Sequence, residues 1–253
     1  MMLPGSELLA AHSAIVFAGP AIILAGYLIF GISGFGASLL TVPVLSYYLS
    51  LKTALPICVL LDFTSAMVLG MRLRGGVEKR EILLLVPFSL IGAVTGATLL
   101  LHLPRQAALA ALGCFAFTYG IYSLWRGAAV AHIGPWWSLP AGFVGGVMGA
   151  LFGVGGPPYA IYLTGRLRDP SRFRATMSAM VVASVGMRAA VFAIIGLIMR
   201  DTLIAFALLF PFACLGLWGG QRLHGYIPNR RLLQFLGGLV ALSGASLLYK
   251  ALL

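Results

Sequence analysis

Charged residues are scarce in this chain, and their scarcity is the first guide to its class. Only 9% of the 253 residues are charged, with 17 Lys and Arg against 6 Asp and Glu, whereas soluble domains carry roughly 25% charged residues. Hydrophobic residues make up 60% of the chain. This composition excludes an ordinary soluble domain and predicts an integral membrane protein.

Cysteine and histidine are also rare, and this limits the chemistry available. The three cysteines lie inside apolar runs without metal-ligand spacing, which indicates small buried residues rather than a disulfide or zinc framework. The four histidines all fall at segment ends or in loops: His12, His102, His132 and His224. We therefore expect no metal, no cofactor and no enzyme activity, since an intramembrane enzyme needs a base at membrane depth.

The net charge of +11 does not indicate a nucleic-acid partner. The sequence has no basic stripe with interleaved aromatic residues, and membrane loops rich in Lys and Arg account for the excess of cations. The charges gather in three clusters, at 72–81, 166–174 and 222–231. We interpret these clusters as loops, and we expect membrane lipid and a small solute as partners.

Ten apolar segments follow one another along the chain, and two of them, 37–50 and 157–165, are short. Each short segment is preceded by a glycine-rich stretch that starts at Gly31 or Gly153. Glycine and proline cost roughly 1 and 3 kcal/mol inside a helix, so these stretches predict two broken helices. The other segments predict eight full spans of the membrane, at about 12–31, 54–71, 82–101, 107–125, 136–152, 175–198, 203–221 and 232–252.

An internal repeat relates the first part of the chain to the second. A shift of 119 residues superimposes the glycine-rich stretch 34–36 on 153–155. A shift of 124 residues places six residues on identical ones, namely Pro87, Phe88, Gly92, Gly96, Pro104 and Gly113 on Pro211, Phe212, Gly216, Gly220, Pro228 and Gly237. We therefore predict two halves, 1–130 and 131–253, with five segments each.

The distribution of cations indicates that the two halves are inverted. If the chain reverses at each glycine break, twelve Lys and Arg fall on one face of the membrane and four on the other. Short cytoplasmic loops normally carry such an excess. The sequence thus predicts an all-α helix bundle of two inverted repeats in the bacterial inner membrane, with both termini outside the cytoplasm.

The two glycine breaks are the candidate binding site. Unwound backbone cannot face lipid, so the breaks must be buried in protein or line a wet cavity. A helix that starts after a break, here near Ala37 and Tyr159, directs free N–H groups and about half a positive charge into the gap, which suits an anion. The residues expected to contact the anion are Ser33, Gly34, Gly36, Ser38, Gly153, Gly155, Gly156 and Pro157, with Thr41 as a further hydroxyl donor. The alternative is that the glycines only allow tight helix packing.

Asp62 and Arg188 are the two charged residues near the middle of apolar segments. An ionised group at mid-membrane costs roughly 2.5–3.5 kcal/mol, so both should face the interior and have a partner. We expect Arg188 to bind the anion and Asp62 to couple transport to protons or to gate it. The alternative is a structural ion pair between the two.

The motifs at the two breaks resemble those of the sulfite and organosulfonate exporter family TauE/SafE. The resemblance covers nearly the whole chain and rests on the stretch 31–36 leading into 41–43, on 149–158, and on the duplicated halves. In the first copy Ala37 and Ser38 follow Gly36, where the family usually has a third glycine. The resemblance implies secondary transport of sulfite or a sulfonate, usually outward across a bacterial inner membrane.

Three other functions stay open at this point. The same site could carry another small anion, such as a carboxylate, thiosulfate or a sulfur-containing amino acid. The stretch Gly31-Ile32-Ser33-Gly34 matches the Gly-x-Ser-Gly of rhomboid-type intramembrane proteases, although the histidine base is missing. A membrane scaffold without a solute path is the third alternative. The glycine-rich helix faces would permit a homodimer in each case.

Overall fold

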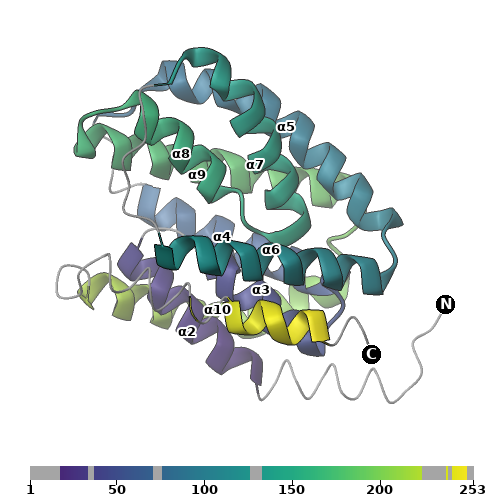
Figure 1. Ribbon diagram of the computed structural model, residues 1–253. Helices are drawn as coiled ribbons and strands as arrows, with labels where there is room; N and C mark the ends of the chain where they lie inside the picture. Colours follow the sequence, from purple (N-terminus) through teal and green to yellow (C-terminus); the bar gives the residue numbers. More distant parts are fainter. Residues whose placement is uncertain are drawn as a thin grey trace. The chain divides into compact units, whose positions relative to one another are not determined.

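The computed structural model describes residues 18–33, 37–70, 76–125, 133–223, 238 and 241–249, and its regular structure in these ranges is helical (Figure 1). This confirms the all-α prediction for the part of the chain that is described. The helices are α2 Gly19–Ser33, α3 Ala37–Tyr48, α4 Leu51–Gly70, α5 Lys79–His102, α6 Arg105–Trp125, the 3-10 turn η2 Pro135–Trp137, α7 Ser138–Phe152, α8 Gly156–Arg166, α9 Pro170–Ile194, α10 Arg200–Leu223 and a last helix at 241–249.

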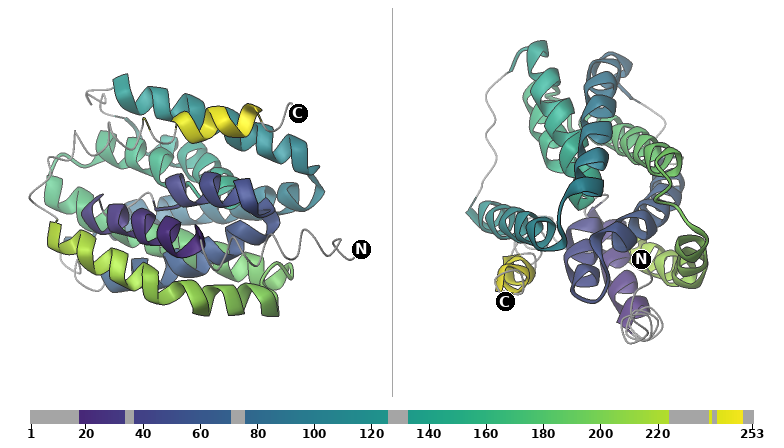
Figure 2. Two further views of the ribbon diagram at one scale, coloured as in Figure 1. Left: turned by 90° about the horizontal axis from the view of Figure 1, so that it is seen from below. Right: turned by 90° about the vertical axis from the view of Figure 1, so that its right-hand side faces the viewer.

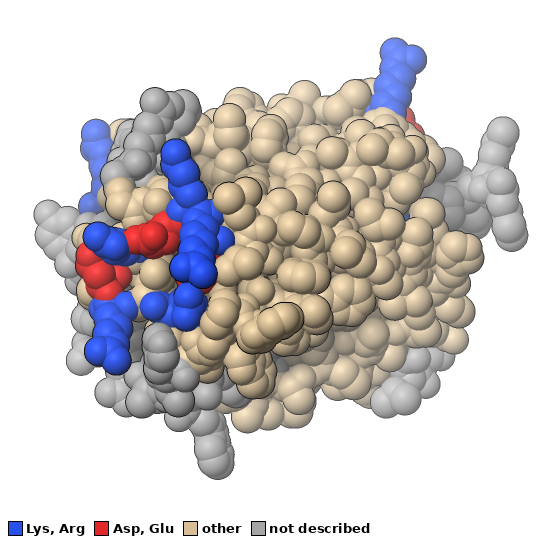
Figure 3. All heavy atoms as spheres, turned by 90° about the horizontal axis from the view of Figure 1, so that it is seen from above, with Lys and Arg blue, Asp and Glu red and all other residues tan. Residues whose placement is uncertain are grey.

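Four of the described helices are long and apolar enough to cross a membrane. Their apolar spans are Leu51–Val68, Lys79–His102, Pro170–Ile194 and Arg200–Leu223. Two shorter apolar helices cover Gly19–Ile32 and Gln106–Thr118. On the face drawn in Figure 3, acidic and basic side chains gather towards the edges and leave a wide uncharged area, as expected for a surface that contacts lipid.

The helix boundaries follow the predicted segments approximately. Helix α9 begins at Pro170 and not at 175, and α2 continues to Ser33, so the first residues of the predicted glycine break are helical. Helix α3 begins at Ala37, as expected, but α8 begins at Gly156, three residues before the predicted start at Tyr159. Pro157 and Pro158 therefore lie in the first turn of α8 and not in the break. Proline fits a first turn because its fixed φ is already helical and its missing N–H has no partner there in any case.

The chain forms two compact units, and each takes helices from both predicted sequence halves. The first comprises Met1–Cys58, Pro104–Trp125 and Met199–Leu253, and the second comprises Val59–Leu103 and Arg126–Ile198. The boundary passes through α4, between Cys58 and Val59. The halves 1–130 and 131–253 describe a repeat in the sequence, which this division does not test.

In the first unit, α2 packs along α10 through glycines that let the two backbones approach closely (Figures 1 and 2). A Cβ atom at Gly216 would lie 2.5 Å from the carbonyl oxygen of Leu24, and one at Gly220 would clash with the carbonyl oxygen of Leu28. Side chains larger than hydrogen are therefore excluded at both glycines.

In the second unit, α5 packs along α7 in the same way (Figure 2). A Cβ atom at Gly96 would lie 2.7 Å from the carbonyl oxygen of Val147, and one at Gly92 would clash with the carbonyl oxygen of Phe143. The shift of 124 residues relates Gly92 and Gly96 of α5 to the two glycines of α10. The shift of 119 residues relates the residues whose carbonyls they face, Leu24 and Leu28 of α2, to Phe143 and Val147 of α7. The two helix pairs thus use equivalent positions of the repeat.

Candidate anion site at the second glycine break

The break after α7 is made by a glycine in the left-handed backbone region. Gly153 has φ +77°, and its N–H donates to the carbonyl of Gly149 over 2.9 Å. The N–H of Val154 donates to the carbonyl of Met148 over 3.3 Å. This is the hydrogen-bond pattern of a glycine C-cap, which ends a helix because only glycine adopts that conformation without strain. The break predicted at Gly153–Gly155 is thus present.

The start of α8 offers fewer backbone donors than a typical helix N-terminus. The first four N–H groups of a helix, counted from its N-cap, have no partner within the helix. Here those positions are Gly155, Gly156, Pro157 and Pro158, and the two prolines have no N–H. An anion at this end could therefore use the amides of Gly155 and Gly156, and any further donors must be side chains.

Arg188 supplies a cation beside the break. Its side chain comes from α9, is 3% exposed, and donates from Nη1 to the carbonyl of Gly149 over 2.6 Å. A Cβ atom at Gly149 would lie 3.2 Å from Cδ of Arg188 and 3.6 Å from Cα of Gly155. The structure therefore brings Arg188, which lies 39 positions after Gly149 in the sequence, next to Gly149 and Gly155. The absence of a side chain at Gly149 makes the approach possible.

The side chain of Tyr159 lies beside Gly155, at a position for which the sequence predicts only the start of a helix. A Cβ atom at Gly155 would lie 3.4 Å from the Tyr159 hydroxyl oxygen. The Tyr159 hydroxyl is 2.6 Å from Oγ of Ser89 on α5 and 3.2 Å from Oγ of Ser184 on α9. Ser184 precedes Arg188 by four residues, so both point from the same side of α9. The three hydroxyls thus form a polar cluster, and its Tyr159 member lies beside Gly155.

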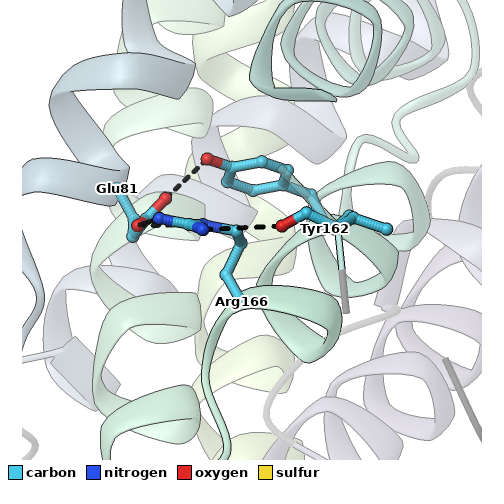
Figure 4. Close-up of polar contacts among 4 residues, drawn as sticks. Glu81, Tyr162 and Arg166 are labelled. Atoms are coloured by element: carbon cyan, nitrogen blue, oxygen red, sulfur yellow. Dashed lines mark hydrogen bonds and ion pairs between the residues drawn. The ribbon is translucent and has the colours of Figure 1, made fainter. Parts of the chain in front are cut away.

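The far end of α8 is held to α5 by a second polar cluster (Figure 4). Arg166 donates from Nε and Nη2 to Oε1 of Glu81, over 3.2 and 2.8 Å, and the Tyr162 hydroxyl donates to Oε2 of Glu81 over 2.5 Å. Arg166 Nη1 also reaches the carbonyl of Ile133 at 3.5 Å. The prediction that Arg166 and Glu81 belong to loops is wrong, because both lie in helices, with side chains 17% and 7% exposed.

The first glycine break is only partly described. Gly34 and Gly36 lie outside the described residues, and Ser33 is the last residue of α2. Ser38 and Thr41 in α3 are both buried. Thr41 donates to the carbonyl of Ala37 over 3.0 Å, which is a bond within its own helix.

The mid-membrane carboxylate is also buried. Asp62 lies in the part of α4 that belongs to the second unit and is 5% exposed. Its neighbour Phe63 packs on α9, where a Cβ atom at Gly186 would lie 3.2 Å from the Phe63 ring. The coupling role of Asp62, and its alternative pairing with Arg188, stay predictions.

Comparison with known proteins shows the family to which the chain belongs. The model of the family described as sulfite exporter TauE/SafE matches residues 18–247. The chain belongs to the TauE/SafE family. It is also similar to the probable inner membrane transporter protein TsaS of Comamonas testosteroni, with 30% identity over 191 residues, which is 75% of this chain and 80% of that protein. No solved structure matches.

Membership of TauE/SafE confirms the resemblance inferred from the glycine motifs. It makes this chain a membrane transporter, which fits the apolar helices of the second unit and α10.

Proposed function

We propose that this chain is a secondary transporter that moves sulfite or a small organosulfonate across the bacterial inner membrane, in the outward direction. The observation that carries the proposal is Arg188, a buried cation that contacts Gly149 and lies beside the Gly155 break, in a chain that belongs to TauE/SafE. The relative in Comamonas testosteroni, described as a probable inner membrane transporter, supports the location.

The proposed substrate site combines two kinds of donor with a glycine turn. Arg188 neutralises the charge of the anion, the amides of Gly155 and Gly156 donate from the N-terminus of α8, and Gly153 provides the turn that opens the helix. Pro157 contributes by fixing the first turn of α8 rather than by donating. The first break, with Ser33, Gly34, Gly36 and Ser38, is proposed as the equivalent site of the first half.

The proposed transport mechanism is alternating access by two inverted repeats, 1–130 and 131–253, with eight full spans and two short broken segments. Two observations support the repeat: the matching glycines of the sequence, and the equivalent packing of Gly92 and Gly216 against carbonyl groups related by the same repeat. Asp62 is proposed to couple transport to a proton gradient.

A homodimer stays a prediction, and the glycine-rich faces of α5 and α10 do not support it. The glycines of α5 and α10 that would permit a dimer instead pack against α7 and α2 of the same chain. Membrane lipid is the expected neighbour of the exposed apolar side chains, such as Leu83 and Ile204.

The experiment is transport by the purified protein in liposomes. Vesicles are loaded with sulfite, taurine, thiosulfate or acetate, and efflux is followed with and without a proton gradient. Efflux of sulfite or taurine that is faster than from protein-free vesicles loaded with the same solute supports the proposal. Efflux of acetate alone would point to a carboxylate carrier, and no efflux of any solute would leave the scaffold interpretation.

A further inference from the structure

Three hydroxyl groups form a buried cluster at the start of α8. They belong to Ser89, Tyr159 and Ser184, whose residues are 0%, 1% and 4% exposed. The Tyr159 hydroxyl lies at the centre, 2.6 Å from Ser89 Oγ and 3.2 Å from Ser184 Oγ. Buried polar groups in a membrane protein are costly unless they have partners, so such a cluster requires an explanation.

The serines of this cluster are directed away from their own helices. Hydroxyls in apolar helices commonly donate to a carbonyl three or four residues earlier, and several threonines of this chain do so: Thr41, Thr64, Thr95 and Thr98. The hydrogen bonds described for Ser89 and Ser184 instead go to Tyr159 on α8. Both side chains therefore turn towards the break.

The cluster has more protons than its internal hydrogen bonds use. Three hydroxyls bring three protons, and the two contacts between them take one proton each. One hydroxyl proton is left for an acceptor outside the cluster. A Cβ atom at Gly155 would lie 3.4 Å from the Tyr159 hydroxyl oxygen, so an acceptor held at the opened backbone would be within reach of this hydroxyl.

An anion held by Arg188 would be such an acceptor. Arg188 follows Ser184 by one helical turn, and its Cδ packs against Gly149 next to Gly155. The prolines at 157 and 158 remove two of the four backbone donors of α8, so side-chain hydroxyls are needed to complete the coordination. We infer that Tyr159, supported by Ser89 and Ser184, binds an oxygen atom of the transported anion and selects sulfonate and sulfite groups over carboxylates. This inference rests on the proposed function.

The selectivity follows from the number of oxygen atoms. A sulfite or sulfonate group presents three oxygens, so it can reach Arg188, the α8 amides and the Tyr159 hydroxyl together. A carboxylate is planar and has no third oxygen, so when its two oxygens face Arg188 and the α8 amides it presents no oxygen in the direction of the Tyr159 hydroxyl. Sites built to form a hydrogen bond discriminate against ligands that lack the group.

Binding of methanesulfonate and acetate to the purified protein tests the inference, because the two anions differ only in the head group. Tyr159→Phe should weaken methanesulfonate binding about tenfold, the loss expected for one hydrogen bond to a charged group, and should leave acetate binding unchanged. Tyr162→Phe is the matched control: it removes a buried hydroxyl from the same helix, but one that donates to Glu81, and should not change the preference.

The inference is overturned if Tyr159→Phe keeps the wild-type preference, or if Tyr162→Phe reduces it equally. If Tyr159→Phe does not fold, Ser184→Ala is measured in its place. It should also weaken methanesulfonate binding and leave acetate binding unchanged, and an unchanged preference would overturn the inference. The proposed function fails separately, when the wild-type protein binds neither sulfite nor methanesulfonate. If the wild-type protein binds sulfite and methanesulfonate, and Tyr159→Phe binds them as tightly as the wild type does, only the role of Tyr159 is contradicted.

Discussion

Arg166, at the end of α8, and Glu81, in the first turn of α5, form an ion pair with 2.8 Å between Nη2 and Oε1. The two residues are 85 positions apart in the sequence. At the other end of α8, Tyr159 contacts Ser89, also on α5. Because Glu81 meets residue 166 and Ser89 meets residue 159, the two helices run antiparallel, and α8 is fixed to α5 at both ends.

The ion pair should stabilise the fold measurably. Glu81→Gln leaves the largely buried Arg166 without its charged partner, so we expect a loss of about 3 kcal/mol in the free energy of unfolding, at the lower limit for a broken buried pair. Thermal unfolding of the purified protein in detergent measures this loss. Glu78→Gln is the control, since its partner Arg172 is 58% exposed and such pairs contribute about 0–1 kcal/mol. Equal losses in the two variants would refute the structural role of Glu81.

Adjacent glycines on α10 should differ sharply in their tolerance of a methyl group. A Cβ at Gly220 would clash with the Leu28 carbonyl, whereas Gly219 has open space. Gly220→Ala should therefore cost about 1–3 kcal/mol through overpacking. Gly219→Ala should be neutral or stabilise by up to about 1 kcal/mol, because alanine favours helix. Unfolding of both variants in the same detergent is the measurement, and the reverse order would contradict the α2–α10 packing.

The turn at Gly153 should depend on its backbone conformation. Gly153→Ala places a Cβ in the left-handed region and should cost about 1–2 kcal/mol. Gly153→Asn should cost less, since asparagine enters this region more readily. The comparison is made by thermal unfolding together with sulfite transport. If both variants unfold at the wild-type temperature and transport sulfite at the wild-type rate, the break does not need a residue that favours the left-handed conformation.

The sequence was sufficient to predict the helix break but not its contacts. Gly153 and Gly155 are local signals, because glycine is favoured at helix ends, where Gly153 takes the left-handed conformation. The start of α8 was placed too late because Pro157 and Pro158 were counted as part of the break. Their fit to a first turn depends on the residue at which the helix starts, which the composition of the segment does not specify.

The polar clusters were missed for a different reason. Tyr159, Ser89 and Ser184 are ordinary residues of apolar segments, and the three come together only when α5, α8 and α9 pack. Glu81 and Arg166 looked like loop charges because charge clusters at segment ends usually are exposed. Their pairing joins positions 85 residues apart, and no local pattern indicates a contact at that distance. Arg188, by contrast, is a candidate from the sequence alone, because a charge inside an apolar segment is rare, and the structure confirms that it is buried.

Asp62 provides a test of the coupling mechanism. If Asp62 carries the coupled proton, Asp62→Asn should abolish the dependence of sulfite efflux on a pH gradient and leave sulfite binding within about twofold, since the substituted amide cannot exchange a proton. The measurement is efflux from liposomes over a full pH series. Efflux that keeps the wild-type response to pH in Asp62→Asn would end the proposal.

The central claim is that Arg188 binds the transported anion, and the most direct measurement is the affinity of the purified protein for sulfite, taurine and chloride. Arg188→Ala should weaken sulfite and taurine binding by at least about tenfold, because it removes the buried positive charge. Arg188→Lys should keep part of the affinity. The account is contradicted if the wild-type protein and Arg188→Ala bind all three solutes equally well while remaining folded.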